Sequence, residues 1–346
     1  MKQYLLPPTG TFYKVNMHCH TTISDGSFTP EEIKAFYKSK GYSAVVFTDH
    51  EVLLGHQDLC DENFIALHGY ELAIKEQQNP YRPTGAFMHV HHLNLIAKTQ
   101  DNLTQPFLYK NNLTPGNCRN YLPQMKYHEE ISEFEYSVDG LNHIVDTANR
   151  YGFLVTYNHP NWSMQSTDLI AQIRHLHAVE VINTGCFYHG DHSGLVYGEL
   201  CRKGFPVVPV AGDDNHNRQG TLDSCFAFTM IKAPSLSYEA LLQAYEAGDC
   251  YASCGPEIHD LYIEDGQVHI TTSPVRSILL FSEGRIVLHA PAGLAPFAET
   301  EPITHASFPL SEKLGAFFRF ELVDFDGRRA FSRAYPTAGL LPEDIL

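Results

Sequence analysis

The sequence predicts an α/β domain built largely from parallel strands, followed by a smaller all-β domain. Three observations lead to this expectation. Short apolar runs alternate with helix signals from Lys14 to about Ala252, which is the pattern of strand–helix units. Histidines or carboxylates follow most of these runs, as they do at the carboxyl-end rim of a barrel. From Gly255 onward the helix signals disappear. We therefore expect a barrel over residues 1–255 and a β-rich, sandwich-like domain over residues 256–346.

The first units carry clear start and stop signals. Thr29–Glu32 is a capping box with proline at the first helical position, and Gly41 predicts the end of that helix. Ala44–Phe47 predicts a buried strand that leads to Asp49 and His50. Phe64–Leu67 predicts the next strand, with Glu71 just past its end.

The later units repeat this scheme up to the end of the barrel. Expected helices cover Asp139–Tyr151, ended by Gly152, and a segment ending near Gly204. Expected strands cover Leu93–Ala97, Phe153–Tyr157, Val179–Asn183 and Pro206–Ala211. Residues 99–137 lack clear periodicity, so they predict an irregular insertion that is typical of a lid. The C-terminal strands are expected at Val268–Thr272, Ser277–Phe281, Arg285–Leu288, Phe317–Val323 and Ala330–Arg333.

Composition limits the classes of partner. The chain has 346 residues, of which 43% are hydrophobic, and a net charge of −16 without any basic run. Extended nucleic acids and anionic membranes need clustered cations, so both are excluded as partners. The eight cysteines form no C-x-x-C pair, which favours reduced thiols. Residues 1–16 contain no apolar stretch typical of a signal peptide. We expect a cytoplasmic protein with a small-molecule substrate; the oligomeric state stays open.

The main functional signal is a series of histidines and carboxylates placed after the apolar runs. Imidazoles and carboxylates that converge at one rim bind divalent metals such as zinc, manganese or iron. His18 and His20 lie on the same side of a strand because side chains alternate with period two, whereas Cys19 between them points away. Taken singly, each motif also fits a hydrogen-bonded polar group in a loop. The candidate ligands are His18, His20, Asp25, His50, Glu71, His92, His159, Asp214 and His216.

In this order the motifs over Val15–Pro256 resemble the PHP (polymerase and histidinol phosphatase) superfamily. That resemblance implies a distorted (β/α)7 barrel with two to three divalent metal ions, Zn, Mn or Fe. It implies that one ion is held by His18, His20, Glu71 and Asp214. Glu71 would bridge to a second ion held by His92 and His159, and Asp25, His50 and His216 would hold a third.

Two further assignments concern the histidine before Leu93 and the carboxylate of Asp49. His92 is preferred to His89 and His91 because an apolar strand follows it directly. Asp49 is expected to orient a ligand or to structure its loop.

The second half of the chain shows a narrower resemblance. Glu180–Asn183, Gly212–His216 and Tyr251–Ile258 are similar to the carbaryl-hydrolase-like (CehA/McbA) branch of the same superfamily. In that branch a β-rich domain commonly follows the barrel. The branch includes predicted phosphoesterases and is named for ester and amide cleavage, so the resemblance implies hydrolysis more directly than it identifies the bond.

The leading hypothesis is a metal-dependent phosphoesterase that cleaves a small phosphorylated substrate with a metal-bridging hydroxide. Glu71, Asp214 and His159 are the expected catalytic residues. The expected substrate contacts are Arg82, Asn161, His189 and Arg218, and Trp162 either caps a core or stacks on the substrate.

Two alternatives are kept. The first is a carboxylester, carbamate or amide hydrolase that uses the same metals, with the aromatic residues of the insertion as its specificity element. The second is a metal-stabilised binding module without catalysis.

Overall fold

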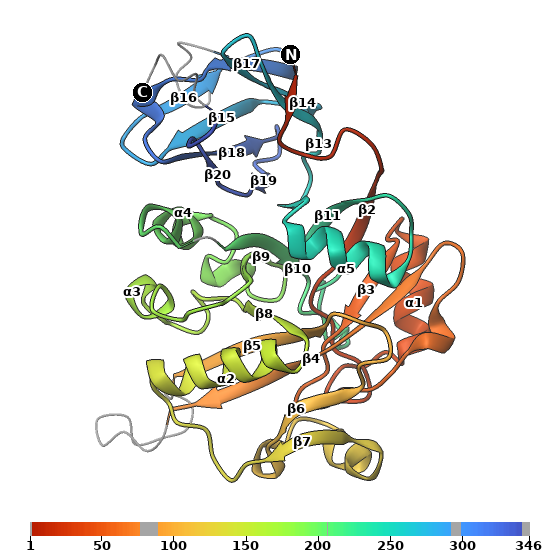
Figure 1. The fold of residues 1–346 in the computed structure, drawn as a ribbon. Helices are drawn as coiled ribbons and strands as arrows, with labels where there is room; N and C mark the ends of the chain where they lie inside the picture. The colour runs from red at the N-terminus through yellow and green to blue at the C-terminus, as the bar shows by residue number, and fades with distance from the viewer. Residues whose placement is uncertain (1, 77–88, 206, 292–298, 341–346) are drawn as a thin grey trace.

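The computed structural model describes residues 2–76, 89–205, 207–291 and 299–340. Arg82 and position 206, for which substrate contact and a strand start were expected, lie outside these ranges. A mixed α/β body forms the larger part of the molecule, and an all-β region is stacked on one end of it (Figure 1). The expected fold class, an α/β body followed by an all-β region, is therefore confirmed.

The α/β body is organised around a curved mixed sheet. Its strands lie in the order β10 (Val208–Gly212), β9 (Ala178–Asn183), β8 (Phe153–Tyr157), β5 (Val90–Ala97), β4 (Ile65–Lys75), β3 (Ala44–Phe47), β2 (Thr11–Asn16), β11 (Phe228–Ala233) and β12 (Cys250–Ser253). Adjacent strands are parallel from β2 to β4 and from β8 to β10. The expectation of parallel strands is wrong for β5, which is antiparallel to both neighbours, and for β11, which is antiparallel to β2.

Strand β10, at one end of this series, lies beside β11 and β12 near the other end. In the described residues no backbone ladder joins β10 to β11. The hydroxyl of Thr229 links these two strands instead, donating to the carbonyl of Ala211 at 3.0 Å and accepting from its amide at 2.9 Å. The strands therefore surround a barrel-like core, with one seam made by a side chain.

Helices cover the outside of the sheet (Figure 1): α1 (Pro30–Ser39), α2 (Val138–Arg150), α3 (Thr167–Ile170), α4 (Leu195–Arg202) and α5 (Tyr238–Ala247). The capping box is confirmed, because the Thr29 hydroxyl accepts from the amide of Glu32 and the Glu32 carboxylate accepts from the amide of Thr29. Capping satisfies amides that have no partner within the helix, which fixes where α1 begins. The helix predicted over Asp139–Tyr151 and the strand Phe153–Tyr157 are confirmed within one residue.

The insertion is more regular than its composition suggested. Strands β6 (Thr104–Leu108) and β7 (Lys126–Glu130) form a small parallel sheet, joined through the 3-10 turns η3 (Lys110–Asn112) and η4 (Cys118–Gln124). The amide side chain of Asn117 donates to the carbonyl of Thr22 at 2.9 Å. The Cys118 thiol donates to the carbonyl of His50 at 3.1 Å. The insertion thus braces the loops that carry Asp25 and His50.

The all-β region is a sandwich of two sheets around its own apolar core. One sheet contains β1 (Gln3–Tyr4), β13 (Ile258–Glu264), β14 (Gln267–Val275) and β17 (Ile303–Pro309). The other contains β16 (Val287–Ala290), β15 (Ser277–Ser282), β18 (Phe317–Val323), β19 (Arg329–Ser332) and β20 (Tyr335–Pro336).

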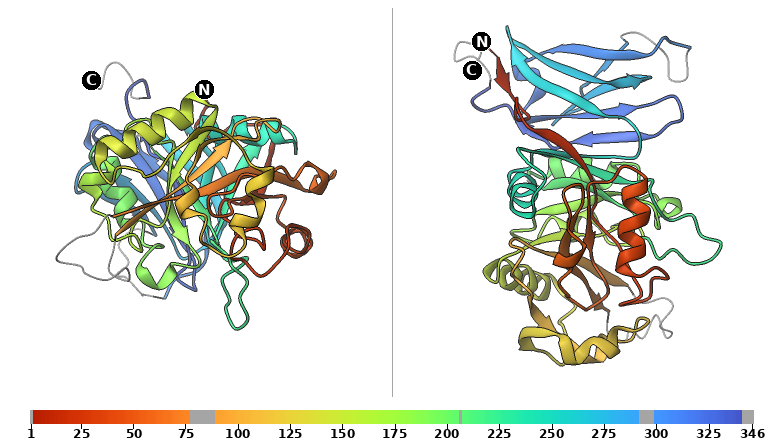
Figure 2. Two further views of the ribbon diagram at one scale, coloured as in Figure 1. Left: turned by 90° about the horizontal axis from the view of Figure 1, so that it is seen from below. Right: turned by 90° about the vertical axis from the view of Figure 1, so that its right-hand side faces the viewer.

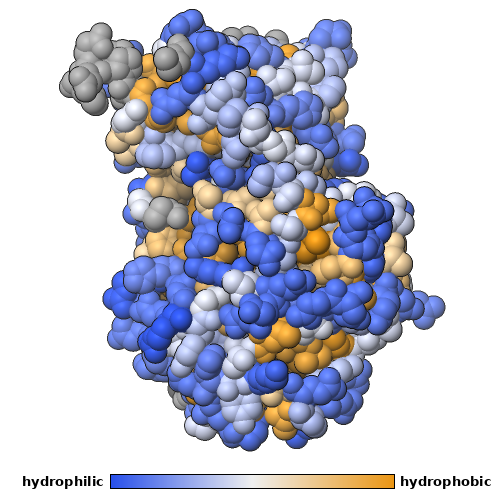
Figure 3. Space-filling model, turned by 45° about the vertical axis from the view of Figure 1, so that its right-hand side comes forward, coloured by the Kyte–Doolittle hydropathy of each residue, from blue (hydrophilic) through white to orange (hydrophobic). Residues whose placement is uncertain are grey.

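The all-β region is joined to the barrel in two ways (Figure 2). β12 pairs with β19, so the barrel sheet continues into the sandwich. At the other end of the chain β1 pairs with β13, so the first described residues pack with the sandwich, although residue 1 onward was expected in the barrel. Apolar surface is visible at the waist between the two parts (Figure 3). Within the described residues no helix has the length and apolar character needed to cross a bilayer.

Candidate metal centre

Side chains from six segments meet at one end of the barrel. β2 leads into the loop with His18, His20 and Asp25, and β3 leads into His50. β8 leads into His159, and β10 leads into Asp214 and His216. Glu71 and His92 lie within β4 and β5. Glu71 was expected just past its strand, but β4 continues to Lys75 because its later residues pair with β5.

The antiparallel course of β5 explains the position of His92. In a parallel strand, a residue near the start would lie at the amino-end rim, far from residues that follow other strands. Because β5 runs in the opposite direction, its start lies beside the carboxyl ends of β4 and β8. The ring of His91 points to the other face, where its Nδ1 lies 2.7 Å from the Tyr157 hydroxyl.

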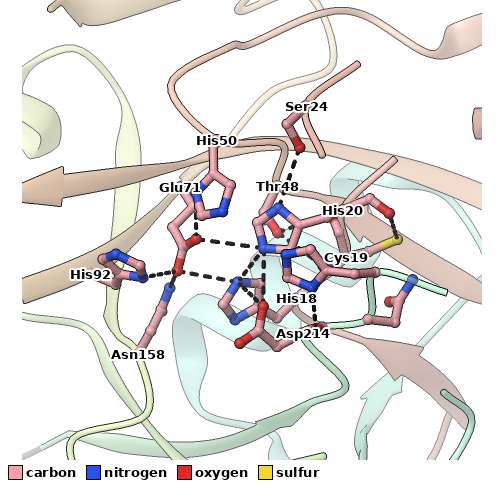
Figure 4. A network of polar contacts seen from close by, with 12 residues as sticks. His18, Cys19, His20, Ser24, Thr48, His50, Glu71, His92, Asn158 and Asp214 are labelled. Carbon is pink, nitrogen blue, oxygen red and sulfur yellow. Dashed lines mark hydrogen bonds and ion pairs between the residues drawn. The ribbon is translucent and has the colours of Figure 1, made fainter. Parts of the chain in front are cut away.

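Glu71 lies at the centre of the cluster (Figure 4). Its Oε1 is 3.0 Å from Nδ1 of His92, 3.3 Å from Nε2 of His18 and 3.4 Å from Nε2 of His159. Its Oε2 is 2.9 Å from Nδ1 of His50 and 3.5 Å from Nε2 of His20. The Glu71 side chain is only 1% exposed. One buried carboxylate therefore faces five imidazoles.

Asp214 and Asp25 extend this cluster towards solvent. Asp214 Oδ1 is 3.0 Å from Nε2 of His20 and 3.3 Å from Nε2 of His18. Asp25 Oδ1 is 3.3 Å from Nε2 of His216 and 3.6 Å from Nε2 of His50.

The nine residues form overlapping groups. Within each group, the ligand atoms all lie within 4.8 Å of one another. The four groups are His18–His20–Glu71, Glu71–His92–His159, His18–His159–Asp214 and His20–Asp25–His50–His216. Every expected ligand belongs to at least one group, and no other described residue does. His20 joins the group of Asp25, His50 and His216, for which it was not expected.

The chemistry of these atoms fits divalent cations. His18 Nε2 lies 3.2 Å from His20 Nε2, so two ring nitrogens face each other. Buried Asp25 Oδ1, Glu71 Oε2 and His92 Nδ1 have no hydrogen-bond partner. Buried polar atoms in native proteins are normally paired, and lone pairs aimed at one space are satisfied by a cation. Imidazole and carboxylate together suit zinc, manganese or iron.

The electrostatics of the cluster keep its carboxylates ionised. Burial opposes ionisation of Glu71, but His92, His18 and His50 together hold the pKa of its carboxyl well below the usual range. Burial likewise disfavours a charged His50, yet the Glu71 carboxylate raises the pKa of this imidazole to about 9. Burial, together with His50 and His216, lowers the pKa of His20 to about 3. A neutral imidazole with a free ring nitrogen is the form that binds a cation.

A second layer of side chains orients these groups. The Glu180 carboxylate is 3.2 Å from Nδ1 of His18 and accepts from the amide of His159 at 3.0 Å. Asn158 donates from Nδ2 to Glu71 Oε1 at 2.8 Å. These partners fix the ring and carboxylate orientations, as outer partners of metal ligands do. The role of Glu180 was missed at the sequence level, although a lone charge inside the apolar run Val179–Ile182 was a usable signal, because such a carboxylate needs a buried partner.

Asp49 structures the loop after β2, as one of its two expected roles. Its Oδ1 accepts from the amides of Thr21 and Ser24 at 2.7 and 3.1 Å, and its Oδ2 accepts from the Thr21 hydroxyl at 2.8 Å. The Cys19 side chain is buried in an apolar cluster with Ile33 and other core residues. It therefore points away from the ligands, as the strand periodicity predicted.

The backbone is unusual at two of the candidate ligands. His159 has φ 24° and Asp214 has φ 52°, in a region that residues other than glycine seldom adopt. Such conformations cluster at functional sites, where surrounding contacts hold them. A Cβ atom at Gly212 would lie 2.7 Å from Cβ of His18, so glycine is required for β10 to approach β2 here.

The expected substrate contacts are placed differently from one another. Arg218 lines the cavity above the ligands, and its Nη2 donates to Asp25 Oδ2 at 2.7 Å. Asn161 instead holds its own loop, because its Nδ2 donates to the carbonyl of Gly190 and to Asp191. His189 is exposed and does not line this cavity. Arg82 lies outside the described residues.

Trp162 forms a wall of the cavity. Its ring centroid is 4.8 Å from that of His159 and 5.2 Å from that of His92. The Asp191 carboxylate fixes the loop by accepting from the amides of Trp162 and Asn161, each at 3.0 Å. Of the two roles considered for Trp162, the structure places its ring beside the candidate ligands and next to the space available to a substrate.

The cavity above the nine residues has a volume of about 560 Å³. A larger cavity of about 910 Å³ lies at the waist, where Leu154, Phe205, Val208 and Phe317 are among its apolar lining. None of the groups of potential metal ligands in the described residues lies there. Convergence of polar groups, and not size, therefore identifies the candidate site.

Comparisons with known proteins show only remote similarity. No family model and no curated protein matches the chain. A two-domain protein from Bacteroides vulgatus, described as containing a predicted PHP-like metal-dependent phosphoesterase, has 14% identity and a TM-score of 0.46 over 96% of this chain and 98% of that one. A candidate metal-dependent phosphoesterase from Bifidobacterium adolescentis has 15% identity and a TM-score of 0.40 over 63% and 91% of the two chains.

A third solved structure is an amidohydrolase from Chromobacterium violaceum with bound sulfate and no metal. It has 11% identity and a TM-score of 0.40 over 68% of this chain and 96% of that one. With every TM-score below 0.5, function has to be inferred from the side chains of the site itself.

Proposed function

We propose that the protein is a metal-dependent phosphoesterase of the PHP type that hydrolyses a small phosphorylated substrate. The observation that carries this proposal is that nine imidazoles and carboxylates converge in overlapping groups, and that seven of these nine residues line one cavity of about 560 Å³. Overlapping groups favour more than one cation. A phosphate ester carries more charge than a carboxylic ester, so its hydrolysis gains more from several adjacent cations. The resemblance in the sequence motifs supports the same class.

In this proposal the chain's residues have distinct tasks. His18, His20, Glu71 and Asp214 would hold one ion, Glu71 with His92 and His159 would hold a second, and Asp25, His50 and His216 would hold a third. When bound, such cations would neutralise phosphate oxygens and lower the pKa of a water molecule.

Proton transfer is assigned to Asp214. Its side chain is 11% exposed, whereas that of Glu71 is 1% exposed, so Asp214 is the carboxylate that substrate and water reach more easily. Asp214 Oδ2 lies 3.8 Å from Nε2 of His159, so both side chains face the same reacting space; His159 would bind a cation through that nitrogen, and Asp214 would pass the proton to solvent. Glu71 acts as the bridging ligand and Arg218 as a contact to a phosphate oxygen.

The test compares p-nitrophenyl phosphate with p-nitrophenyl acetate on manganese-loaded protein, with Glu71→Gln as the blank. Glu71 contacts five imidazoles, so its loss should cost more than the 10- to 100-fold that losing an outer partner of a ligand costs, roughly 10³-fold or more in kcat/KM. Bound metal, measured on the same samples, should fall with it.

The measurement with p-nitrophenyl acetate distinguishes the phosphoesterase from a second candidate, a carboxylester, carbamate or amide hydrolase. The apolar cavity wall formed by Trp162 also suits that candidate. Cleavage of p-nitrophenyl acetate without cleavage of p-nitrophenyl phosphate would contradict the phosphoesterase proposal and support that hydrolase. Full phosphate turnover in Glu71→Gln would remove the site from the reaction altogether.

A further inference from the structure

The mouth of the metal cavity carries large apolar side chains that are almost fully exposed. Among the described residues, Tyr188 and Leu222 are the two large apolar side chains that are more than nine-tenths exposed, at 100% and 98%. Both line the metal cavity, together with Trp162. Single exposed apolar residues are common on protein surfaces, but a gathering around one cavity marks a binding surface.

These three side chains come from three separate loops of the same rim. Trp162 follows β8, Tyr188 lies in the 3-10 turn η5 (Phe187–His189) after β9, and Leu222 lies in the loop between β10 and β11. That last loop projects from the barrel (Figure 2). Loops after barrel strands are where specificity is built, because the strands beneath them are fixed.

The charges that line the cavity limit the number of phosphate groups. Arg218 is the only lysine or arginine among the described lining residues, and Asp25 already neutralises it at 2.7 Å. The other charged lining residues include the carboxylates Glu71, Asp214 and Asp223. Glu71 and Asp214 would be shared with the bound ions, so further phosphates of a substrate would meet only Asp223 and the Asp25-paired Arg218 among the other charged lining residues. One phosphate group at the metal ligands is therefore favoured over a polyphosphate.

The remaining volume has to be filled by the rest of the substrate. A cavity of about 560 Å³ is within the usual range for small-molecule sites and much larger than a phosphate group alone. The indole of Trp162, the phenol ring of Tyr188 and the side chain of Leu222 offer flat or apolar contacts, which suit a planar apolar ring.

We propose that the substrate is a phosphate monoester of an aromatic or similarly flat apolar alcohol, whose ring lies among Trp162, Tyr188 and Leu222. This inference rests on the proposed phosphoesterase function. Water cleaves the P–O bond, the phosphate keeps the water oxygen, and the ring leaves as its alcohol. Tyr188 and Leu222 determine specificity by burying the ring, while the metal ligands act on the phosphate.

The test uses two phosphonates that resist hydrolysis, phenylphosphonate and methylphosphonate. The chain contains a single tryptophan, so Trp162 fluorescence in the manganese-loaded protein reports binding directly at the rim. Burying a large apolar group favours binding by about tenfold or more, so phenylphosphonate should bind at least about tenfold more tightly than methylphosphonate. In parallel, kcat/KM should favour phenyl phosphate over methyl phosphate.

The variants are Tyr188→Ala and Leu222→Ala, which change exposed side chains and should leave the fold intact. Each should reduce the preference for the phenyl compound several-fold and leave methylphosphonate binding unchanged. Leu195→Ala is the matched control, because Leu195 is 74% exposed but does not line the cavity.

Two negative results are distinguishable. Equal binding of both phosphonates, or a rim variant that behaves like Leu195→Ala, would overturn the proposed ring site while phosphate turnover persisted. Failure to hydrolyse any phosphate ester, with neither phosphonate bound, would overturn the phosphoesterase function itself.

Discussion

At the carboxyl ends of β8 and β10 the barrel gathers nine imidazoles and carboxylates, whereas at the amino ends of the same strands it holds a larger cavity lined mainly by apolar side chains. Charged groups around the waist cavity form ion pairs, apart from the Nε of Arg333, which has no hydrogen-bond partner. Lys98 lies 2.6 Å from Glu246, and His175 lies 2.7 Å from Asp146. At the rim, in contrast, ring nitrogens and carboxylate oxygens face one another and several have no donor.

The two cavities differ in whether their buried polar groups have partners, and this difference indicates where the chemistry takes place. An apolar cavity with paired charges can exist as a consequence of packing two parts together. Buried polar atoms that converge without partners cost free energy unless something binds them. The rim is therefore assigned to function and the waist to the junction of the barrel with the all-β region, and this assignment can be tested at both ends.

Replacing a buried charge at the junction of the barrel and the all-β region should mainly lower the unfolding free energy. The Arg319 guanidinium, 4% exposed, lies 3.6 Å from the Glu321 carboxylate and stacks over Tyr197 of α4. Glu321 also pairs with the Arg329 guanidinium, so Glu321→Gln leaves both cations without this countercharge, which should cost about 3 kcal/mol of unfolding free energy. Denaturant unfolding at pH 7 measures this cost, while kcat per bound metal should stay at the wild-type value. A drop in kcat would show that the junction takes part in the reaction.

A smaller effect is expected from the matching buried carboxylate at the rim. Glu180 orients His18 and the backbone of His159, so Glu180→Gln should lower metal affinity or kcat/KM by about 10- to 100-fold. Metal titration and steady-state kinetics give both quantities. If Glu180→Gln and Glu321→Gln lowered kcat/KM by the same factor, the functional distinction between the rim and the junction would be contradicted.

The sequence predicted much of this rim because its ligands follow recognisable local signals. Short apolar runs bury their strands, and a polar residue directly after such a run must lie near the rim. That reasoning placed His50, His159 and Asp214 at strand ends, where the structure also has them. The capping box at Thr29 was equally readable, since it depends on residues only three positions apart.

What could not be predicted depends on contacts between distant segments. The direction of β5 is set by its pairing with β4 and β8, so the antiparallel course was missed. Asn161 was expected to contact substrate, but Asp191, thirty positions away, fixes it in its loop. The insertion folds into paired strands because Thr104 and Lys126 meet in register, which local periodicity does not reveal. The exposure of Tyr188 and Leu222 likewise appears only once three loops are placed around the cavity.

A third effect concerns pH and separates the histidines of the two ends. His177 lines the waist cavity, where burial lowers its pKa to about 4 although its ring contacts the carbonyl of Tyr245 at 3.1 Å. In the unfolded chain the pKa returns to about 6.5. Between these values the unfolded state binds more protons, so stability is lost as pH falls from 6.5 towards 4.

His177→Gln removes that dependence. On metal-free protein, the loss of unfolding free energy between pH 7 and pH 5 should therefore be about 2 kcal/mol smaller in the variant than in the wild type. Rim histidines titrate in both proteins and cancel in this difference. His143→Gln is the control, because His143 is exposed and lies outside the lining of the waist cavity. If the unfolding free energy of His177→Gln kept the pH dependence of the wild type, solvent would reach His177 in the folded protein. That result would contradict the contrast between an apolar waist and a polar rim.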